Sequence, residues 1–124
     1  MPCRPDALII RSGENFTYLT GIAYPGTLGR HTDLTGSTRS PVLIWPRSGE
    51  PELILNDFAV AYTKLVSELP ISVYLGYREQ PYAKVADRLR ERDVRRVGLE
   101  YNYCSKRDYD ILRAATQDIE FIDA

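Results

Sequence analysis

The residues that could carry chemistry are few and widely spaced. The chain has one histidine, His31, and two cysteines, Cys3 and Cys104, among its 124 residues. A structural zinc site needs about four Cys or His ligands at short spacings, and a catalytic triad needs a histidine beside its nucleophile. No GxxxxGK[ST], GxGxxG, HExxH or GxSxG motif occurs. The sequence therefore predicts no catalytic residue and no metal ligand in this chain.

One long polar segment is the exception. Residues 24–40 read YPGTLGRHTDLTGSTRS and contain the single histidine. A loop of this length inside a compact domain is usually functional or disordered. Its glycines allow close approach of the backbone, and an arginine presents a planar fork that fits a carboxylate. The candidate binding residues are Tyr24, Arg30, His31 and Arg39. A surface loop that binds nothing is the alternative.

Composition and charge narrow the class of protein. With 16 Lys and Arg against 17 Asp and Glu, the formal net charge is −1, and 44% of the residues are hydrophobic. This length and composition predict one globular domain. A nucleic-acid partner is not expected, because such proteins usually carry a basic excess. The basic segment RLRERDVRR at 88–96 is interleaved with acidic residues and is interpreted as the solvated end of a helix.

Neither a membrane nor an oxidising compartment is indicated. No apolar run approaches the roughly 20 residues that span a bilayer, and the start MPCRPD lacks the features of a signal peptide. Two distant cysteines are expected to be free thiols in a reducing cytoplasm. Nine tyrosines and one tryptophan exceed what a small core needs, and they leave open whether a protein–protein surface is present.

Apolar periodicity predicts an α/β fold. Strands are expected at 7–10, 42–45, 52–55, 71–75, 96–101 and 121–124, and helices at 12–21, 58–69, from residue 81 to about residue 92, and at 105–115. The second and third strands flank a Ser-Gly turn and form a hairpin. Alternation of this kind favours one mixed sheet, largely parallel, with helices packed on its faces.

The expected helix ends and core faces follow from residue type. Ser12 and Gly21 bound the first helix, Asn56 or Asp57 caps the second, and Ser105 with Asp108 forms a capping box. Pro70 ends the second helix and Pro81 starts the third. The expected core faces are Phe58, Ala61, Tyr62, Leu65, Val66 and Leu69 in the second helix, Tyr82, Val85, Ala86 and Leu89 in the third, and Tyr109, Leu112 and Ala115 in the fourth.

Four stretches resemble one known family. They are DALII at 6–10, ENFTYLTG at 14–21, PVLIWPRSGEPELIL at 41–55 and RRVGLEYNYCSKRDYDILRAATQDIEFIDA at 95–124. In this order and spacing they are similar to the N-terminal domain of the creatinase/prolidase (Xaa-Pro aminopeptidase) family. The resemblance covers most of residues 1–124. It implies a ribonuclease H-like mixed sheet of about six strands in a single domain, without ribonuclease activity.

The resemblance also implies where the chemistry lies. In the family this domain precedes a larger "pita-bread" metallopeptidase domain, whose two Asp, one His and two Glu hold two divalent metals, expected to be Mn, Co or Zn. None of those ligands maps onto this chain, so the C-terminal domain is expected to be absent from it and the chain alone to be inactive. The family's usual amphipathic helix ahead of DALII is also not matched by MPCRP at 1–5. A trimmed chain and a natural stand-alone domain both remain open.

The expected role is accessory. The resemblance implies a non-catalytic domain that caps the active site and takes part in a homodimer, with a peptide or small carboxylate as substrate. LGRH at 28–31 is similar to the creatinase branch, in which an arginine of this loop meets the substrate carboxylate, so Arg30 takes that role here. Two alternatives stay open: a stand-alone binding or dimerisation module, and the N-terminal domain of a creatinase-like amidinohydrolase.

Overall fold

Six strands form one mixed sheet in the order β4-β3-β2-β1-β5-β6. The computed structural model describes residues 4–11, 13–22, 41–75 and 79–124, and the candidate loop residues lie outside these ranges. The strands are β1 (Ala7–Arg11), β2 (Val42–Pro46), β3 (Glu52–Asn56), β4 (Ile71–Tyr74), β5 (Arg96–Leu99) and β6 (Glu120–Asp123). All six lie within two residues of their predicted bounds.

The central strand β1 joins the two halves of the sheet. It pairs antiparallel with β2, where Ile9 lies opposite Ile44, and parallel with β5, where Ile9 lies opposite Leu99. Strands β2 and β3 form the predicted antiparallel hairpin, and β3–β4 and β5–β6 pair in parallel. The predicted mixed sheet with one antiparallel hairpin is confirmed.

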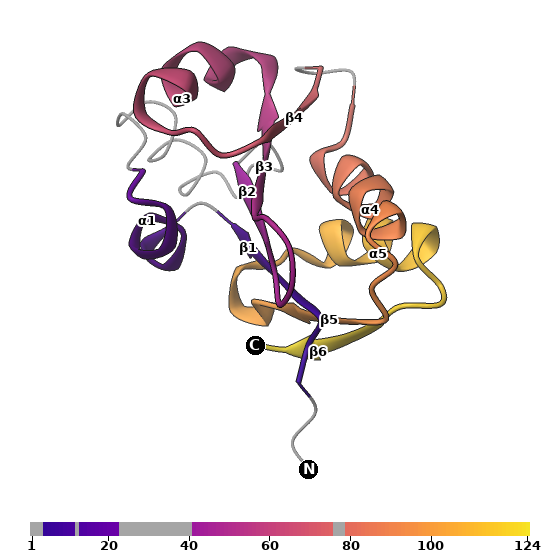
Figure 1. Cartoon of the computed structure of the whole chain (residues 1–124). Helices are drawn as coiled ribbons and strands as arrows, with labels where there is room; N and C mark the ends of the chain where they lie inside the picture. The colour runs from indigo at the N-terminus through magenta and orange to yellow at the C-terminus, as the bar shows by residue number, and fades with distance from the viewer. Residues whose placement is uncertain (1–3, 12, 23–40, 76–78) are drawn as a thin grey trace.

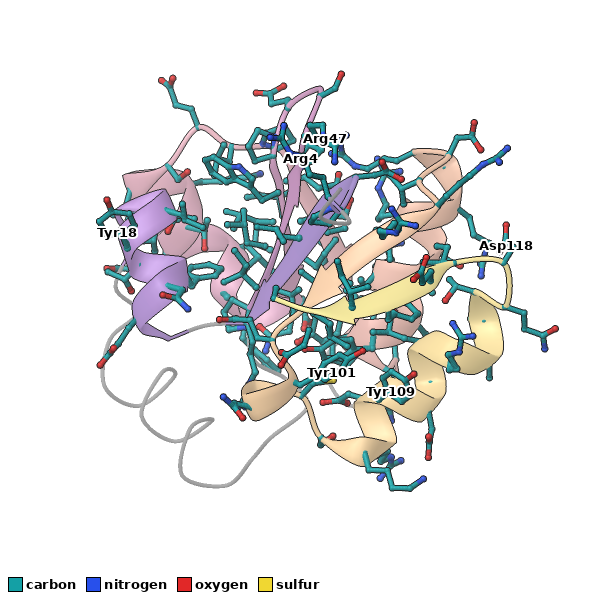
Figure 2. All side chains as sticks on the ribbon, turned by 90° about the horizontal axis from the view of Figure 1, so that it is seen from below. Arg4, Tyr18, Arg47, Tyr101, Tyr109 and Asp118 are labelled. Carbon is teal, nitrogen blue, oxygen red and sulfur yellow. The ribbon has the colours of Figure 1, made fainter. Side chains whose placement is uncertain are left out.

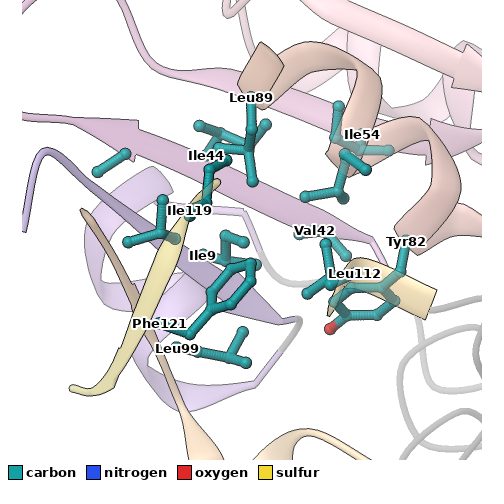
Figure 3. Packing of buried hydrophobic residues seen from close by; sticks show 14 of the residues in the cluster. Ile9, Val42, Ile44, Ile54, Tyr82, Leu89, Leu99, Leu112, Ile119 and Phe121 are labelled. Atoms are coloured by element: carbon teal, nitrogen blue, oxygen red, sulfur yellow. The ribbon is translucent and has the colours of Figure 1, made fainter. Parts of the chain in front are cut away.

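Helices cover both faces of this sheet. They are α1 (Glu14–Thr20), α3 (Val60–Val66), α4 (Pro81–Glu91) and α5 (Lys106–Ala115), with short 3-10 turns η1 (Asp57–Ala59) and η2 (Tyr101–Tyr103). Helices α4 and α5 lie together on one face, and α1 and α3 lie on the other (Figure 1). Each face has its own apolar core. The larger one, under α4 and α5, includes Ile9, Val42, Leu89, Leu112 and Phe121 (Figure 3).

The helix ends follow the predicted capping chemistry. Gly21 adopts the left-handed conformation at φ 74° and closes α1, because glycine reaches this region without steric cost. The Asn56 side chain accepts a hydrogen bond from the Ala59 amide at 3.0 Å, and Ser105 Oγ accepts one from the Asp108 amide at 3.1 Å. The N-cap residue of α1 is Gly13, which has no side chain to accept a capping hydrogen bond. The predicted cap Ser12 lies outside the described residues.

The predicted core face of the second helix is confirmed only in part. Tyr62 and Leu69 are partly buried and pack against the core, whereas the other predicted residues, Phe58, Ala61, Leu65 and Val66, are exposed. The helix is a 3-10 turn followed by seven α-helical residues that end at Val66, rather than a continuous helix to residue 69. The side chains that face the sheet are Ala59 and Thr63, which are buried, whereas Phe58 and Leu65 are 63% and 84% exposed. The Thr63 hydroxyl bonds the Ala59 carbonyl at 2.7 Å, which satisfies it inside the core. The side of this helix that carries Phe58, Ala61 and Leu65 therefore faces solvent.

Three smaller predictions also differ from the structure. The fourth strand, predicted to run to residue 75, ends at Tyr74. Tyr74 is fully buried, whereas Val73 and Leu75 are 37% and 51% exposed. Ala115, predicted to face the core, is exposed. The buried residue at this end of α5 is Thr116, which follows Ala115. The fifth strand ends at Leu99 because η2 begins at Tyr101. None of these differences alters the order of the strands.

Candidate functional site

The parallel strands β1 and β5 end side by side, and their carboxyl ends form one end of the sheet, which is called the candidate edge below. In open α/β sheets, ligands bind outside the carboxyl ends of the strands. The chain also enters β2 at this edge, because Val42 pairs with Arg11, the last residue of β1. The described chain thus resumes at Pro41 and enters the sheet here. This edge is the candidate site.

The four binding residues predicted from the sequence are not placed by the structure. Tyr24, Arg30, His31 and Arg39 all lie outside the described residues. Their roles stay predictions. What the structure supplies is the framework of described side chains at the edge to which this segment connects.

Glu100 is the central side chain of that framework. It follows β5 directly, and its carboxylate links two other elements. Oε1 accepts a hydrogen bond from the Arg11 amide at 3.3 Å, and Oε2 accepts one from Asn15 Nδ2 of α1 at 2.7 Å. Glu100 thus joins β5, β1 and the start of α1. A hydrogen bond to a charged acceptor is stronger than one between neutral groups.

A small cavity opens beside this carboxylate. It has a volume of about 250 Å³ and is lined by Leu8, Ile9, Ile10, Asn15, Tyr18, Leu19, Glu100 and Ala124. Its walls are mainly apolar, and its polar side chains are those of Asn15, Tyr18 and Glu100. This combination suits an apolar side chain better than a charged substrate. Since Ala124 forms part of the wall, the cavity lies beside the end of β6.

Aromatic residues hold the segment after Glu100 in place. The Tyr101 hydroxyl donates to the Phe121 carbonyl of β6 at 3.1 Å. The Tyr101 and Tyr109 rings make an edge contact with their centroids 6.4 Å apart (Figure 2), and Tyr109 makes a similar contact with Phe121 at 6.1 Å. Edge-to-face pairs of this kind stabilise by about 0.5–1.5 kcal/mol beyond their burial. Several of the tyrosines thus serve the domain's own packing.

Three further titratable residues, Cys104, Asp108 and Tyr82, lie near the start of α5 and at the start of α4. Burial raises the pKa of the Cys104 thiol to about 11 and also raises the pKa of Tyr82. A thiol that stays protonated at neutral pH is a poor nucleophile. Burial likewise raises the pKa of Asp108, against the lowering influence of Ser105 and Arg11. These groups are therefore suited to packing rather than to covalent catalysis.

Asp108 provides a test of this interpretation. Its side chain is buried, and Oδ1 has no hydrogen-bond partner among the described residues. Because its folded-state pKa is raised, the folded protein binds the extra proton and loses stability as pH rises from the ordinary value of 3.8 through the raised one. We expect Asp108→Asn to be more stable than the parent at pH 7, by on the order of 1 kcal/mol. The advantage should shrink toward acidic pH in urea unfolding.

The exposed Asp110 on the same helix is the matched control. It pairs with Lys106 Nζ at 2.8 Å, and both side chains are largely exposed. Asp110→Asn is expected to change the free energy of unfolding by less than about 0.5 kcal/mol. If Asp108→Asn instead lowers the free energy of unfolding at neutral pH, the buried Asp108 carboxylate stabilises the fold, and the prediction is wrong.

The described residues contain neither a cluster suited to a metal ion nor a helix suited to a membrane. No group of three or more His, Cys, Asp and Glu side chains among them is arranged to hold a metal ion. In the same part of the chain, no helix is both long enough and apolar enough to cross a membrane.

The fold and the candidate edge define an α/β domain of a type known from other proteins. Residues 4–124 match the Creatinase/Prolidase N-terminal domain family, so the chain belongs to that family. No curated protein sequence matches the chain significantly. The resemblance seen in the sequence is confirmed.

Solved structures with this fold come from peptidases. A proline dipeptidase from Streptococcus pneumoniae superposes with a TM-score of 0.74 at 21% identity, over 96% of this chain and 80% of its own. The N-terminal domain of cytoplasmic peptidase PepQ from Mycobacterium tuberculosis gives 0.74 at 18% identity, over 97% and 82%. The Xaa-Pro dipeptidase from Bacillus anthracis gives 0.73 at 14% identity, over 97% of this chain and 29% of that longer one.

The sequence did not single out Glu100 or Asn15. Glu100 stands in RVGLEY directly after an apolar strand, and a polar residue at the carboxyl end of a parallel strand is a recognisable signal. Asn15 gives no comparable signal, because its role depends on α1 packing beside β5 in space.

Proposed function

We propose that the chain is the non-catalytic N-terminal domain of an Xaa-Pro peptidase-like metallohydrolase, and that it covers the active site of a following catalytic domain. The observation that carries the proposal is the family match over residues 4–124. A supporting observation is that the similar domain makes up 29% of the Bacillus anthracis Xaa-Pro dipeptidase chain. The catalytic partner would be the remaining, larger part of such a protein.

Catalysis is assigned to that partner because the described residues offer no reactive group for it. Cys104 is held as a protonated thiol, and no metal-binding group occurs among the described residues. Two divalent metals, Mn, Co or Zn, would be held by the catalytic domain and would activate water there. The part played by this chain is to exclude water and to orient the substrate.

Substrate orientation is assigned to the segment that rejoins the sheet at Val42. Arg30 would pair its guanidinium with the carboxylate of a peptide or small carboxylate substrate, with His31, Tyr24 and Arg39 nearby. Glu100 and Asn15 would hold the edge from which this segment extends. The assembly we propose is a cytoplasmic homodimer, in which such a domain can cover the active site of its own or the neighbouring subunit.

The proposal is tested in the protein that carries both domains. Arg30→Ala is expected to raise KM for an Xaa-Pro dipeptide at least tenfold, because a charge-assisted bond to the substrate carboxylate is lost. Arg107→Ala, on the exposed side of α5, is the control and should leave KM unchanged. An unchanged KM in the Arg30 variant would remove this residue from the substrate site.

A further inference from the structure

The outer edge of β4 carries backbone groups that no described strand pairs. Strand β4 is the end strand of the sheet, and its inner neighbour is β3 (Figure 1). The Leu53 amide bonds the Pro70 carbonyl at 2.9 Å, and Leu53 lies opposite Ile71. Alternate residues of a strand direct their backbone N–H and C=O groups to opposite sides, so Ser72 bonds β3. The N–H and C=O groups of Ile71 and Val73 therefore point to the open edge.

No residue of β4 is of the kind that usually protects a sheet edge. Natural proteins place proline or charged side chains in an edge strand, because its free backbone groups pair readily with another chain. The segment ISVY at 71–74 contains neither, and three of its four residues favour strands. An extended peptide can therefore add to this edge as a further strand, through main-chain hydrogen bonds with Ile71 and Val73.

A polar groove lies between this edge and α4. It has a volume of about 400 Å³, and its walls include Ser72 and Val73 of β4 and Lys84 and Arg88 of α4. Ser72 is on the α4 side of the sheet, because it lies opposite Ile54, a residue of the core under α4 and α5. Side chains alternate between the two faces of a strand, so a strand added to β4 would place every second side chain in this groove.

One cation of the groove is not engaged by the domain itself. Arg88 pairs with Glu91, and Arg90 pairs with Asp87. The Lys84 ammonium lines the same groove and makes no ion pair or hydrogen bond with any residue that the structure describes. A carboxylate on an added strand would meet this cation. Opposite charges across an interface select the partner more than they raise its affinity.

We propose that the outer edge of β4 binds an extended peptide segment of a partner protein, in which a Glu or Asp side chain pairs with Lys84. The carboxylate lies in the groove, and the residues on either side of it place their side chains on the opposite face, beside Ile71 and Val73. A second copy of this chain fits less well, because its own β4, ISVY, brings no carboxylate to Lys84. The proposal goes beyond the proposed function, since it uses neither the substrate segment nor a catalytic domain.

Fluorescence anisotropy with two labelled synthetic peptides tests the proposal on the purified chain. The peptide TVEVT presents Glu on one face and two valines on the other, and TVKVT replaces the Glu by Lys. We expect TVEVT to bind at least tenfold more tightly than TVKVT, and Lys84→Glu to reverse this preference. Lys106→Glu is the control, because it changes the net charge equally at an exposed position on α5 and should leave the preference unchanged.

Removal of one backbone donor tests the addition of a strand. Val73→Pro deletes the outward N–H of Val73 and keeps the ladder with β3, whereas Val73→Ala retains that N–H. We expect the proline variant to weaken binding of TVEVT at least tenfold and the alanine variant to weaken it less. Circular dichroism and thermal unfolding of each variant check the fold. The Lys84 variant tests the proposal independently of whether Val73→Pro folds.

Three results would overturn the proposal. The absence of TVEVT binding up to millimolar concentration, or equal binding by the proline and alanine variants, would exclude the addition of a strand. Equal binding of the two peptides to the parent would exclude a carboxylate partner for Lys84. Self-association of the parent that Val73→Pro abolishes would assign the β4 edge to a second copy in place of the peptide.

Discussion

Replacing Phe16 by alanine is expected to lower the free energy of unfolding by about 3–4 kcal/mol. Of the seven residues of α1, Phe16 is the one that is buried, and it is fully inside the core between this helix and the sheet. A helix of this length is not stable by itself, so its position depends on that side chain. The loss should also release Asn15 from its hydrogen bond with Glu100. Urea unfolding at neutral pH measures the change.

Tyr18 on the same helix is the matched control. It is 87% exposed, so Tyr18→Ala removes an aromatic ring without leaving a cavity. We expect its free energy of unfolding to stay within about 0.5 kcal/mol of the parent. If Phe16→Ala loses no more stability than Tyr18→Ala, α1 is held by something other than its one buried side chain.

The second large effect is expected at Glu52. This carboxylate is 3% exposed, and Oε1 accepts a hydrogen bond from Arg88 Nε at 2.9 Å and lies 3.6 Å from Arg92 Nε. The interaction with Glu52 raises the pKa of Arg88 and ties the start of β3 to the end of α4. Glu52→Ala leaves two half-buried cations facing each other. Since both arginines reach solvent, we expect a loss of about 2–3 kcal/mol, below that of a fully buried pair.

Glu91 separates the effect of burial from the effect of pairing. It also bonds Arg88, but its side chain is 64% exposed. Glu91→Ala should lower the free energy of unfolding by less than about 0.5 kcal/mol, and added salt should remove the difference. Equal losses in the Glu52 and Glu91 variants would contradict the assignment of the stabilisation to the buried carboxylate.

The sequence predicted the sheet well because its strands and turns are locally encoded. Runs such as VLIW at 42–45 favour strands in any context, and Gly21, Asn56 and Ser105 act within a few residues of their own positions. The mixed sheet with its antiparallel hairpin followed from the alternation of elements, and the family resemblance implied about six strands. Both signals need only the linear order of residues.

Which side of α3 packs against the sheet was not predictable by the same reasoning. Periodicity shows that Phe58, Ala61 and Leu65 share one side, but not whether that side meets the sheet or solvent. In the structure Thr63 takes the buried position because its hydroxyl is satisfied by the Ala59 carbonyl. The rule that apolar stripes face the core failed for Phe58, Ala61 and Leu65 and held for Tyr62.

The candidate site was predicted only in part. Sequence reasoning selected Arg30 and His31 from the composition of their segment, and the structure places described residues at the edge where that segment rejoins the sheet. Glu100 and Asn15 are 85 residues apart, so their contact depends on the packing of α1 beside β5. Long-range pairs of this kind carry no local signal in a single sequence.

The central claim is that this chain takes part in hydrolysis without performing it. The most direct measurement is the turnover of an Xaa-Pro dipeptide by the purified chain, with and without added Mn²⁺ or Co²⁺. We predict no hydrolysis above the uncatalysed rate in either condition, because the metal-binding residues belong to the proposed catalytic domain. Metal-dependent turnover that remains with the chain through purification would contradict this division of roles.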